Sequence, residues 1–201
     1  DTTAPKQWCP TETAPLLSLE QHRRDSMAHG KISQDPRIDP RIKALFGAFP
    51  EIAMEDATSR ETMVAKANSN EAKAREQAMQ AFLESCDNEN IAPSDGIHID
   101  THVVTSQPDN NSINIQFIRP ETGDLLPCVY YIHGGGMQSL SCYYGNYRAW
   151  GKIIAAQGVA VAMVDFRNAV SPSSVPEVAP FPAGLNDCVS GVKWIAENAK
   201  K

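Results

Sequence analysis

The stretch LPCVYYIHGGGM, residues 126–137, joins a run of apolar residues to three consecutive glycines. Residues 126–132 are apolar without alternation, which is typical of a β-strand covered on both faces. Gly134, Gly135 and Gly136 follow and carry no side chains, so their backbone N–H groups can converge on one point. This stretch predicts a central strand whose carboxyl end leads into a turn facing a crevice.

Helical and strand patterns alternate on the carboxyl side of this turn. Residues 144–157 predict a helix, residues 159–166 a second buried strand, and residues 186–200 another helix. Strand, helix, strand, helix implies right-handed crossovers onto a parallel sheet. The packed stripe of the last helix is expected near Val189, Val192, Lys193 and Ile195.

On the amino side of the glycines, apolar and polar residues alternate in steps of two. Residues 97–103 and residues 113–117 both follow this pattern, and a loop around residues 108–111 separates them. The pattern predicts an antiparallel pair of strands. The fold class is therefore α/β, with antiparallel first strands followed by a parallel sheet with crossover helices.

The first 90 residues have a different character. Residues 1–17 are rich in proline and threonine without periodicity, which favours an extended arm. Asp39 and Pro40 suit the N-cap and first position of a helix. Residues 55–86 have helical spacing and predict one or two helices, with a break at residues 68–70.

Composition and charge narrow the function classes. The net charge is −6, and the chain has no basic run longer than the pair Lys200 and Lys201, so nucleic acid is not expected as a partner. No apolar stretch is long enough to cross a bilayer, and residues 1–13 lack the pattern of a signal peptide. We expect a cytoplasmic protein without a transmembrane segment, although a removed signal peptide would leave no trace.

No cofactor or metal is expected. The five cysteines are widely spaced and form no C-x-x-C pair, and Cys128 and Cys188 lie in apolar segments where a structural, buried role is favoured. His98, Asp100 and His102 share one face of a predicted strand and could in principle bind a metal. The polar outer face of a strand explains the same pattern and is the favoured interpretation.

The three glycines suggest an anion-binding turn. Phosphate is one candidate anion, but the chain has neither the G-x-x-x-x-G-K-[ST] nor the G-x-G-x-x-G spacing, and no lysine lies nearby. The other candidate is the oxyanion of a tetrahedral intermediate in acyl transfer. Fixed backbone amides suit that task.

Four motifs resemble the hormone-sensitive-lipase-like branch of the α/β-hydrolases. They are YYIHGGGM at 130–137, VDFR at 164–167, PFPAGLND at 180–187 and VKWI at 192–195, in the order and at the spacing of that family. The match covers roughly residues 97–201. It implies the α/β-hydrolase fold, present in part and preceded by a helical cap region.

The resemblance also implies domains and site residues. Residues 1–90 would form an arm and helical cap, and residues 91–201 the N-terminal half of the catalytic domain. Gly135 and Gly136 would donate their N–H groups to the substrate oxyanion, and Gly134 would shape the turn. His133 would support the loop through hydrogen bonds, without acting as the general base.

Two features depart from the family pattern or are missing. Residues 168–178 form a Ser/Pro/Val stretch in place of the usual short link, which affects the loops near the pocket. The nucleophile motif G-x-S-x-G is absent, and no triad can be assembled from the five histidines. Arg167 and Asp187 are expected to form a buried ion pair with an architectural role.

These observations lead to one favoured hypothesis and one alternative. The favoured hypothesis is the N-terminal portion of a serine carboxylesterase for small or medium acyl esters, with Ser, Asp or Glu, and His on a C-terminal segment. That segment would be a required partner, because residues 127–132 would otherwise form an open sheet edge. The chain alone would be inactive. The alternative is a noncatalytic hydrolase-like module that binds a ligand or partner.

Overall fold

The computed structural model describes residues 32, 34–47 and 58–199. The chain divides into two compact units, Asp1–Asp56 and Ala57–Lys201. In the first unit, helix α2 (Pro40–Phe46) begins after Asp39, whose carboxylate accepts a 2.8 Å hydrogen bond from the Arg41 amide. This N-cap confirms the predicted helix start. The predicted extended arm lies outside the described residues.

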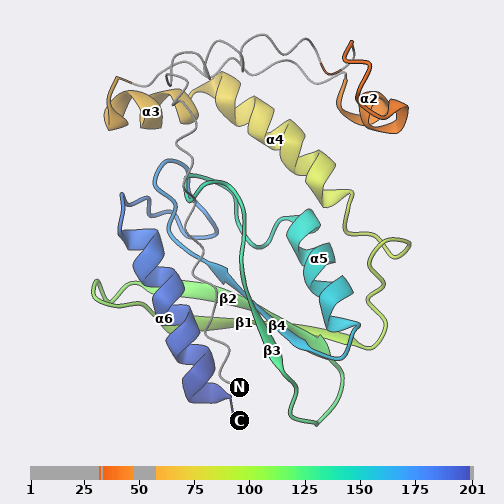
Figure 1. Cartoon of the computed structure of the whole chain (residues 1–201). Coiled ribbons are helices and arrows are strands. Elements are labelled where there is room, and N and C mark those ends of the chain that lie inside the picture. Colours follow the sequence, from red (N-terminus) through yellow and green to blue (C-terminus); the bar gives the residue numbers. More distant parts are fainter. Residues whose placement is uncertain (1–31, 33, 48–57, 200–201) are drawn as a thin grey trace, which may run out of the picture. The chain divides into compact units, whose positions relative to one another are not determined.

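A mixed four-stranded sheet forms the centre of the second unit (Figure 1). Its order is β1-β2-β4-β3, with β1 spanning Ile97–Thr105, β2 Ser112–Pro120, β3 Cys128–Ile132 and β4 Ala160–Asp165. β2 is antiparallel to both β1 and β4, whereas β3 and β4 are parallel. The predicted antiparallel pair and the parallel strands that follow it are both confirmed.

Strand β4 is buried along its whole length because helices cover both of its faces. Ala162 and Val164 face one core cluster, which includes Cys188 from helix α6 (Ala183–Asn198). Val161 and Met163 alternate with them and face a second cluster, which includes Ala155 from α5 (Gly145–Ala155). The unbroken apolar pattern of this segment follows from its two covered faces.

Helices α3 (Arg60–Ala67) and α4 (Asn70–Glu84) precede the sheet. The hydroxyls of Ser59 and Ser69 accept hydrogen bonds from the first turns of these helices and cap them. The break predicted between the two helices is confirmed. Neither helix contributes a buried residue, so hydrophobic burial alone does not attach them to the sheet. The predicted boundary near residue 90 stays a prediction.

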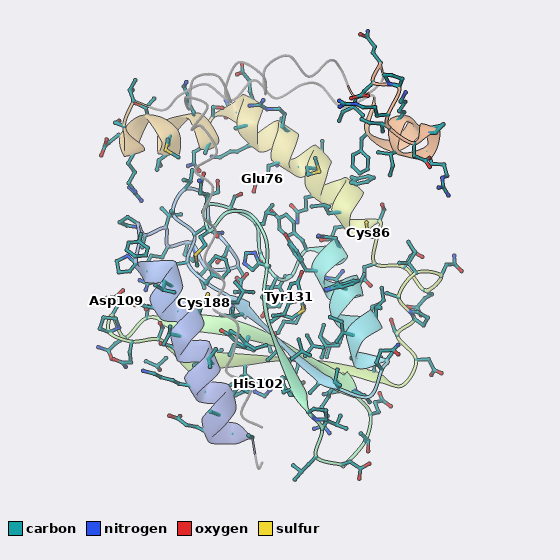
Figure 2. All side chains as sticks on the ribbon, viewed as in Figure 1. Glu76, Cys86, His102, Asp109, Tyr131 and Cys188 are labelled. Carbon is teal, nitrogen blue, oxygen red and sulfur yellow. The ribbon has the colours of Figure 1, made fainter. Side chains whose placement is uncertain are left out.

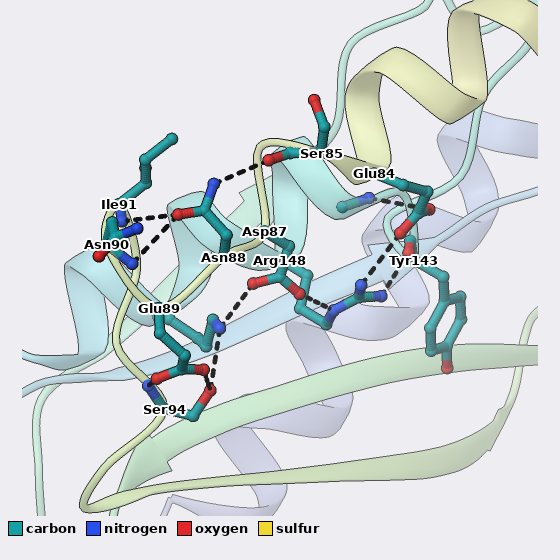
Figure 3. Close-up of polar contacts among 12 residues, drawn as sticks. Glu84, Ser85, Asp87, Asn88, Glu89, Asn90, Ile91, Ser94, Tyr143 and Arg148 are labelled. Atoms are coloured by element: carbon teal, nitrogen blue, oxygen red, sulfur yellow. Dashed lines mark hydrogen bonds and ion pairs between the residues drawn. The ribbon is translucent and has the colours of Figure 1, made fainter.

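Ion pairs attach the end of α4 to α5 (Figure 3). Arg148 pairs with Asp87 and with Glu84, the latter at 3.1 Å, and the buried Lys152 places its Nζ 2.5 Å from Asp87. Burial opposes ionisation of Asp87, but hydrogen bonds from Lys152 and Arg148 lower its pKa below the usual value. The junction is therefore ionic and partly buried.

Two expectations about burial are wrong. β3 lies at the edge of the described sheet, so Cys128, Val129 and Ile132 are exposed instead of covered on both faces. Val189 and Val192 of α6 are also exposed. The buried face of α6 consists mainly of small residues that allow close approach to the sheet: Ala183, Gly184, Asp187, Cys188, Ser190 and Gly191.

A buried arginine joins α6 to the loops beside the sheet. Arg167, which follows β4, places its Nε 2.9 Å from Asp187 and its two terminal nitrogens near Asp109 and Glu177. Burial opposes ionisation of Asp187, but hydrogen bonds from Arg167, Ser106 and other groups lower its pKa. The predicted Arg167–Asp187 ion pair is confirmed.

Replacing Asp187 tests how much this network stabilises the fold. Asp187→Asn preserves size but leaves the buried Arg167 paired only with carboxylates that are about half exposed. We expect the free energy of unfolding to fall by about 3 kcal/mol in urea denaturation at pH 7. The control Asp109→Asn, at the exposed end, should cost less than about 1 kcal/mol. Equal losses would contradict the central role of Asp187.

The lowered pKa of Asp187 also predicts a pH dependence. Its contribution is complete above the unfolded-state pKa of about 4, and is lost as the pH falls through the lower folded-state pKa. The stability difference between wild type and Asp187→Asn should therefore narrow below about pH 4. Denaturation curves at pH 7, 4 and 3 measure this, and a constant difference would disprove it.

Candidate active site

The glycine loop, residues 134–136, is separated from the end of β3 by the single residue His133. His133 between them is buried and stacks on Phe166, with ring centroids 4.3 Å apart. Its Nδ1 donates a 2.7 Å hydrogen bond to the carbonyl of Gly134. Burial lowers the pKa of His133, so the ring is neutral at pH 7. The structure thus places His133 inside the loop, against its first carbonyl.

Backbone conformation explains the glycines at two positions of the loop. Gly135 has φ +112°, and a Cβ there would overlap the backbone oxygen of Ser139. Gly136 has φ +62° with open space around the position of a Cβ. A side chain is excluded at Gly135 by both space and conformation, and is disfavoured at Gly136 by conformation alone.

A pocket of about 340 Å³ borders this loop. Its lining includes Gly136 and Met137, together with Phe181, which precedes α6, and Leu185 in the first turn of α6. Phe181 is 82% exposed and Leu185 46% exposed, so both present apolar surface beside the glycine loop. Of the three loop glycines, Gly136 lines this pocket, and Gly134 and Gly135 are not among its lining residues.

The buried carboxylate of Asp165, at the end of β4, fixes the surrounding loops. One oxygen accepts a 3.0 Å hydrogen bond from the Cys142 amide and the other a 2.8 Å bond from the Ser174 amide. His133 Nε2 lies 3.8 Å from the same carboxylate. In the sequence, Asp165 stands out only as part of the VDFR motif and as the one charged residue at the end of an otherwise apolar strand.

A second, larger cavity of about 1050 Å³ lies at the opposite end of β3 and β4, beside Cys128 and Ala160. His98, Asp100 and His102 line it. His98 and Asp100 form a 2.7 Å hydrogen bond, and the His102 ring packs 4.9 Å from that of Trp194. In Figure 2, His102 lies beside α6.

The described residues contain no cluster of ligands suited to a metal ion. Nor does any of their helices combine the length and hydropathy that a membrane span needs.

The described histidines and Ser190 do not form a serine–histidine pair. His98 bonds to Asp100, and His133 bonds to the Gly134 carbonyl. His22 and His29 lie outside the described residues. Ser190, inside α6, is buried and accepts a hydrogen bond from the Gln107 amide.

Comparison with known proteins points to esterases. The sequence profile of the BD-FAE family matches residues 114–201. Esterase Est22 is 64% identical in sequence and superposes with a TM-score of 0.80 over 85% of this chain and 49% of that one. Brefeldin A esterase, described as a bacterial homologue of human hormone-sensitive lipase, is 29% identical with a TM-score of 0.65, over 85% of this chain and 47% of that one.

A curated relative agrees with the solved structures. Carboxylesterase NlhH of Mycobacterium tuberculosis is 36% identical over 80 residues, which are 40% of this chain and 23% of that protein. The chain spans about half the length of the solved esterases that it matches. In sequence and in fold, the chain matches the N-terminal portion of hormone-sensitive-lipase-like carboxylesterases of the α/β-hydrolase superfamily.

Proposed function

We propose that the whole protein is a serine carboxylesterase acting on small or medium acyl esters, and that this chain supplies its oxyanion hole. The observation that carries the proposal is the glycine loop after β3, which borders a pocket with apolar walls. The 64% identity to an esterase over most of the chain supports it. The pocket, at about 340 Å³, is near the lower end of small-molecule sites, which suits a modest acyl group.

In the proposed reaction, a serine from another segment attacks the ester carbonyl. The carbonyl oxygen becomes negatively charged, and the N–H groups of Gly135 and Gly136 stabilise it. Loss of one such donor typically costs about 3 to 4 kcal/mol of barrier stabilisation. A base on that other segment takes the serine proton and passes it to the alcohol, which leaves as the tetrahedral intermediate collapses to the acyl-enzyme. Water then attacks the acyl-enzyme, the acid is released and the serine regains its proton. His133 supports the loop: it is neutral and its Nδ1 proton is engaged by Gly134.

We also propose that the segment with the triad pairs with β3. The outer edge of β3 has no neighbouring strand among the described residues, and its Val129 and Ile132 side chains are exposed. The exposed Val189 and Val192 of α6 provide further apolar surface. A strand and helix from the complementary segment would cover both.

Glycine substitutions test the oxyanion hole in the full-length protein. Gly135→Ala should lower kcat for a p-nitrophenyl ester by about 100-fold or more, because the added methyl group displaces the loop. Gly136→Ala has open space and suffers only from its positive φ, so a smaller loss is expected. Gly123→Ala is the matched control, since its Cβ meets no atom within 4 Å. Wild-type kcat in Gly135→Ala would refute the assignment.

A serine-directed fluorophosphonate probe tests where the nucleophile lies. The full-length protein should be labelled at a serine beyond residue 201, and residues 1–201 expressed alone should be neither labelled nor active. Labelling of a serine within residues 1–201 would disprove the proposal that the nucleophile lies on another segment. Saturable ester binding by the full-length protein without turnover or labelling would favour a noncatalytic binding module.

A further inference from the structure

Residues 168–171 run beside the turn that follows the glycine loop, residues 137–140. The amide of Ala169 donates a 2.9 Å hydrogen bond to the Met137 carbonyl. The amides of Val170 and Ser171 donate to the Gln138 carbonyl at 3.1 and 2.9 Å. Three consecutive amides thus bind two consecutive carbonyls. This segment begins the Ser/Pro/Val stretch in which the sequence departs from the family pattern.

Asn168 adds the one side-chain bond that reaches the far end of the turn. It is fully buried, and its Nδ2 donates a 2.7 Å hydrogen bond to the Leu140 carbonyl. Its own carbonyl accepts a 3.0 Å bond from the Ala179 amide, which fixes its backbone. If the side-chain amide of Asn168 were flipped, its Oδ1 would face the Leu140 carbonyl oxygen. Nδ2 must therefore be the atom that faces this carbonyl. Its Oδ1 has no hydrogen-bond partner among the described residues.

The turn that these bonds hold has an unfavourable backbone conformation. Met137 has φ +57° and Leu140 has φ +76°, both in the left-handed region that side chains disfavour. Such residues persist where their surroundings impose the conformation, and they are frequent at active sites. The bonds from residues 168–171 contact the carbonyls of both residues.

The turn is in direct contact with the glycine loop. The Gln138 amide donates a 3.0 Å hydrogen bond to the Gly135 carbonyl. The Ser139 carbonyl lies so close to Gly135 that no Cβ could fit between them. The Gly135 carbonyl lies in the same planar peptide unit as the Gly136 N–H group, so a shift of the turn would change the direction of the Gly136 N–H group.

Helix α3 holds the other side of residues 168–171. The guanidinium of Arg60 donates a 3.1 Å hydrogen bond to the Ala169 carbonyl, and Asn68 Nδ2 donates a 3.4 Å bond to the Val170 carbonyl. Residues 168–171 thus lie between α3 and the turn, bonded to both.

We propose that Asn168 is a positioning residue for the oxyanion hole, with residues 168–171 as a clamp that fixes the glycine loop. Asn168 does not touch the substrate. It binds the Leu140 carbonyl and so fixes the turn, and the turn, through the Gly135 carbonyl, sets the direction of the Gly136 N–H group. The catalytic consequence rests on the proposed esterase function, whereas the effect on loop order does not.

The test uses Asn168→Leu in the full-length protein, a substitution of similar size without hydrogen bonds. We expect kcat for a p-nitrophenyl ester to fall about 10- to 100-fold, below the loss for a missing oxyanion donor. KM should change less than about threefold, because ground-state binding does not use the oxyanion hole. Amide hydrogen exchange in residues 133–141 should become faster.

Two further variants separate positioning from general destabilisation. Ser106→Ala removes a buried hydrogen bond to Asp187 that has no contact with the turn, so it should lower stability and leave kcat unchanged. Arg60→Ala removes an exposed donor to the clamp and does not threaten folding. It should lower kcat about two- to fivefold, since one outer bond of several is lost.

The outcomes distinguish the two proposals. Wild-type kcat and unchanged exchange in folded Asn168→Leu would overturn the positioning role. If Asn168→Leu fails to fold, wild-type kcat and exchange in Arg60→Ala would overturn the clamp. A wild-type protein without esterase activity would refute the proposed function, and the exchange data would still decide whether Asn168 orders the loop.

Discussion

The geometry around the candidate site depends on one buried carboxylate at the end of β4. Asp165 accepts hydrogen bonds from the amides of Cys142 and Ser174, which lie on the segments after β3 and after β4. These segments carry the glycine loop and the clamp. A carboxyl group in a dry interior is stable only when hydrogen-bond donors satisfy its oxygens. The same bonds therefore satisfy the carboxyl group of Asp165 and hold the two loops together at the carboxyl end of β4.

The fold was largely predictable because its strongest signals are periodic. The unbroken apolar run of β4, the alternation in β1 and β2, and the break between α3 and α4 each reflect a local physical requirement. The packed face of α6 was not predictable in this way. Small residues determine it, because Gly191 lies against the Tyr130 hydroxyl and Gly184 against the Arg167 carbonyl. Hydrophobicity scales give such close contacts little weight.

In the candidate site, too, one part could be predicted from the sequence and another could not. The glycine loop is visible in the sequence because three adjacent residues share one unusual property. The clamp is not visible, because its bonds use backbone amides and one asparagine that is 28 residues from its acceptor. No spacing rule links those positions. By contrast, β3 has the composition of a central strand, and its place at the edge of the described sheet is the open edge expected where the complementary segment is absent.

The environment of His133 has a consequence for acid–base behaviour. Its ring is stacked on Phe166 and shielded from water, and its pKa is lowered, so it stays uncharged from neutral to alkaline conditions. A histidine beside a candidate active site would ordinarily be suspected whenever a rate profile bends near neutrality. The lowered pKa of His133 moves its ionisation to the acid side of the usual histidine range, so an inflection above that range belongs to a different ionising group.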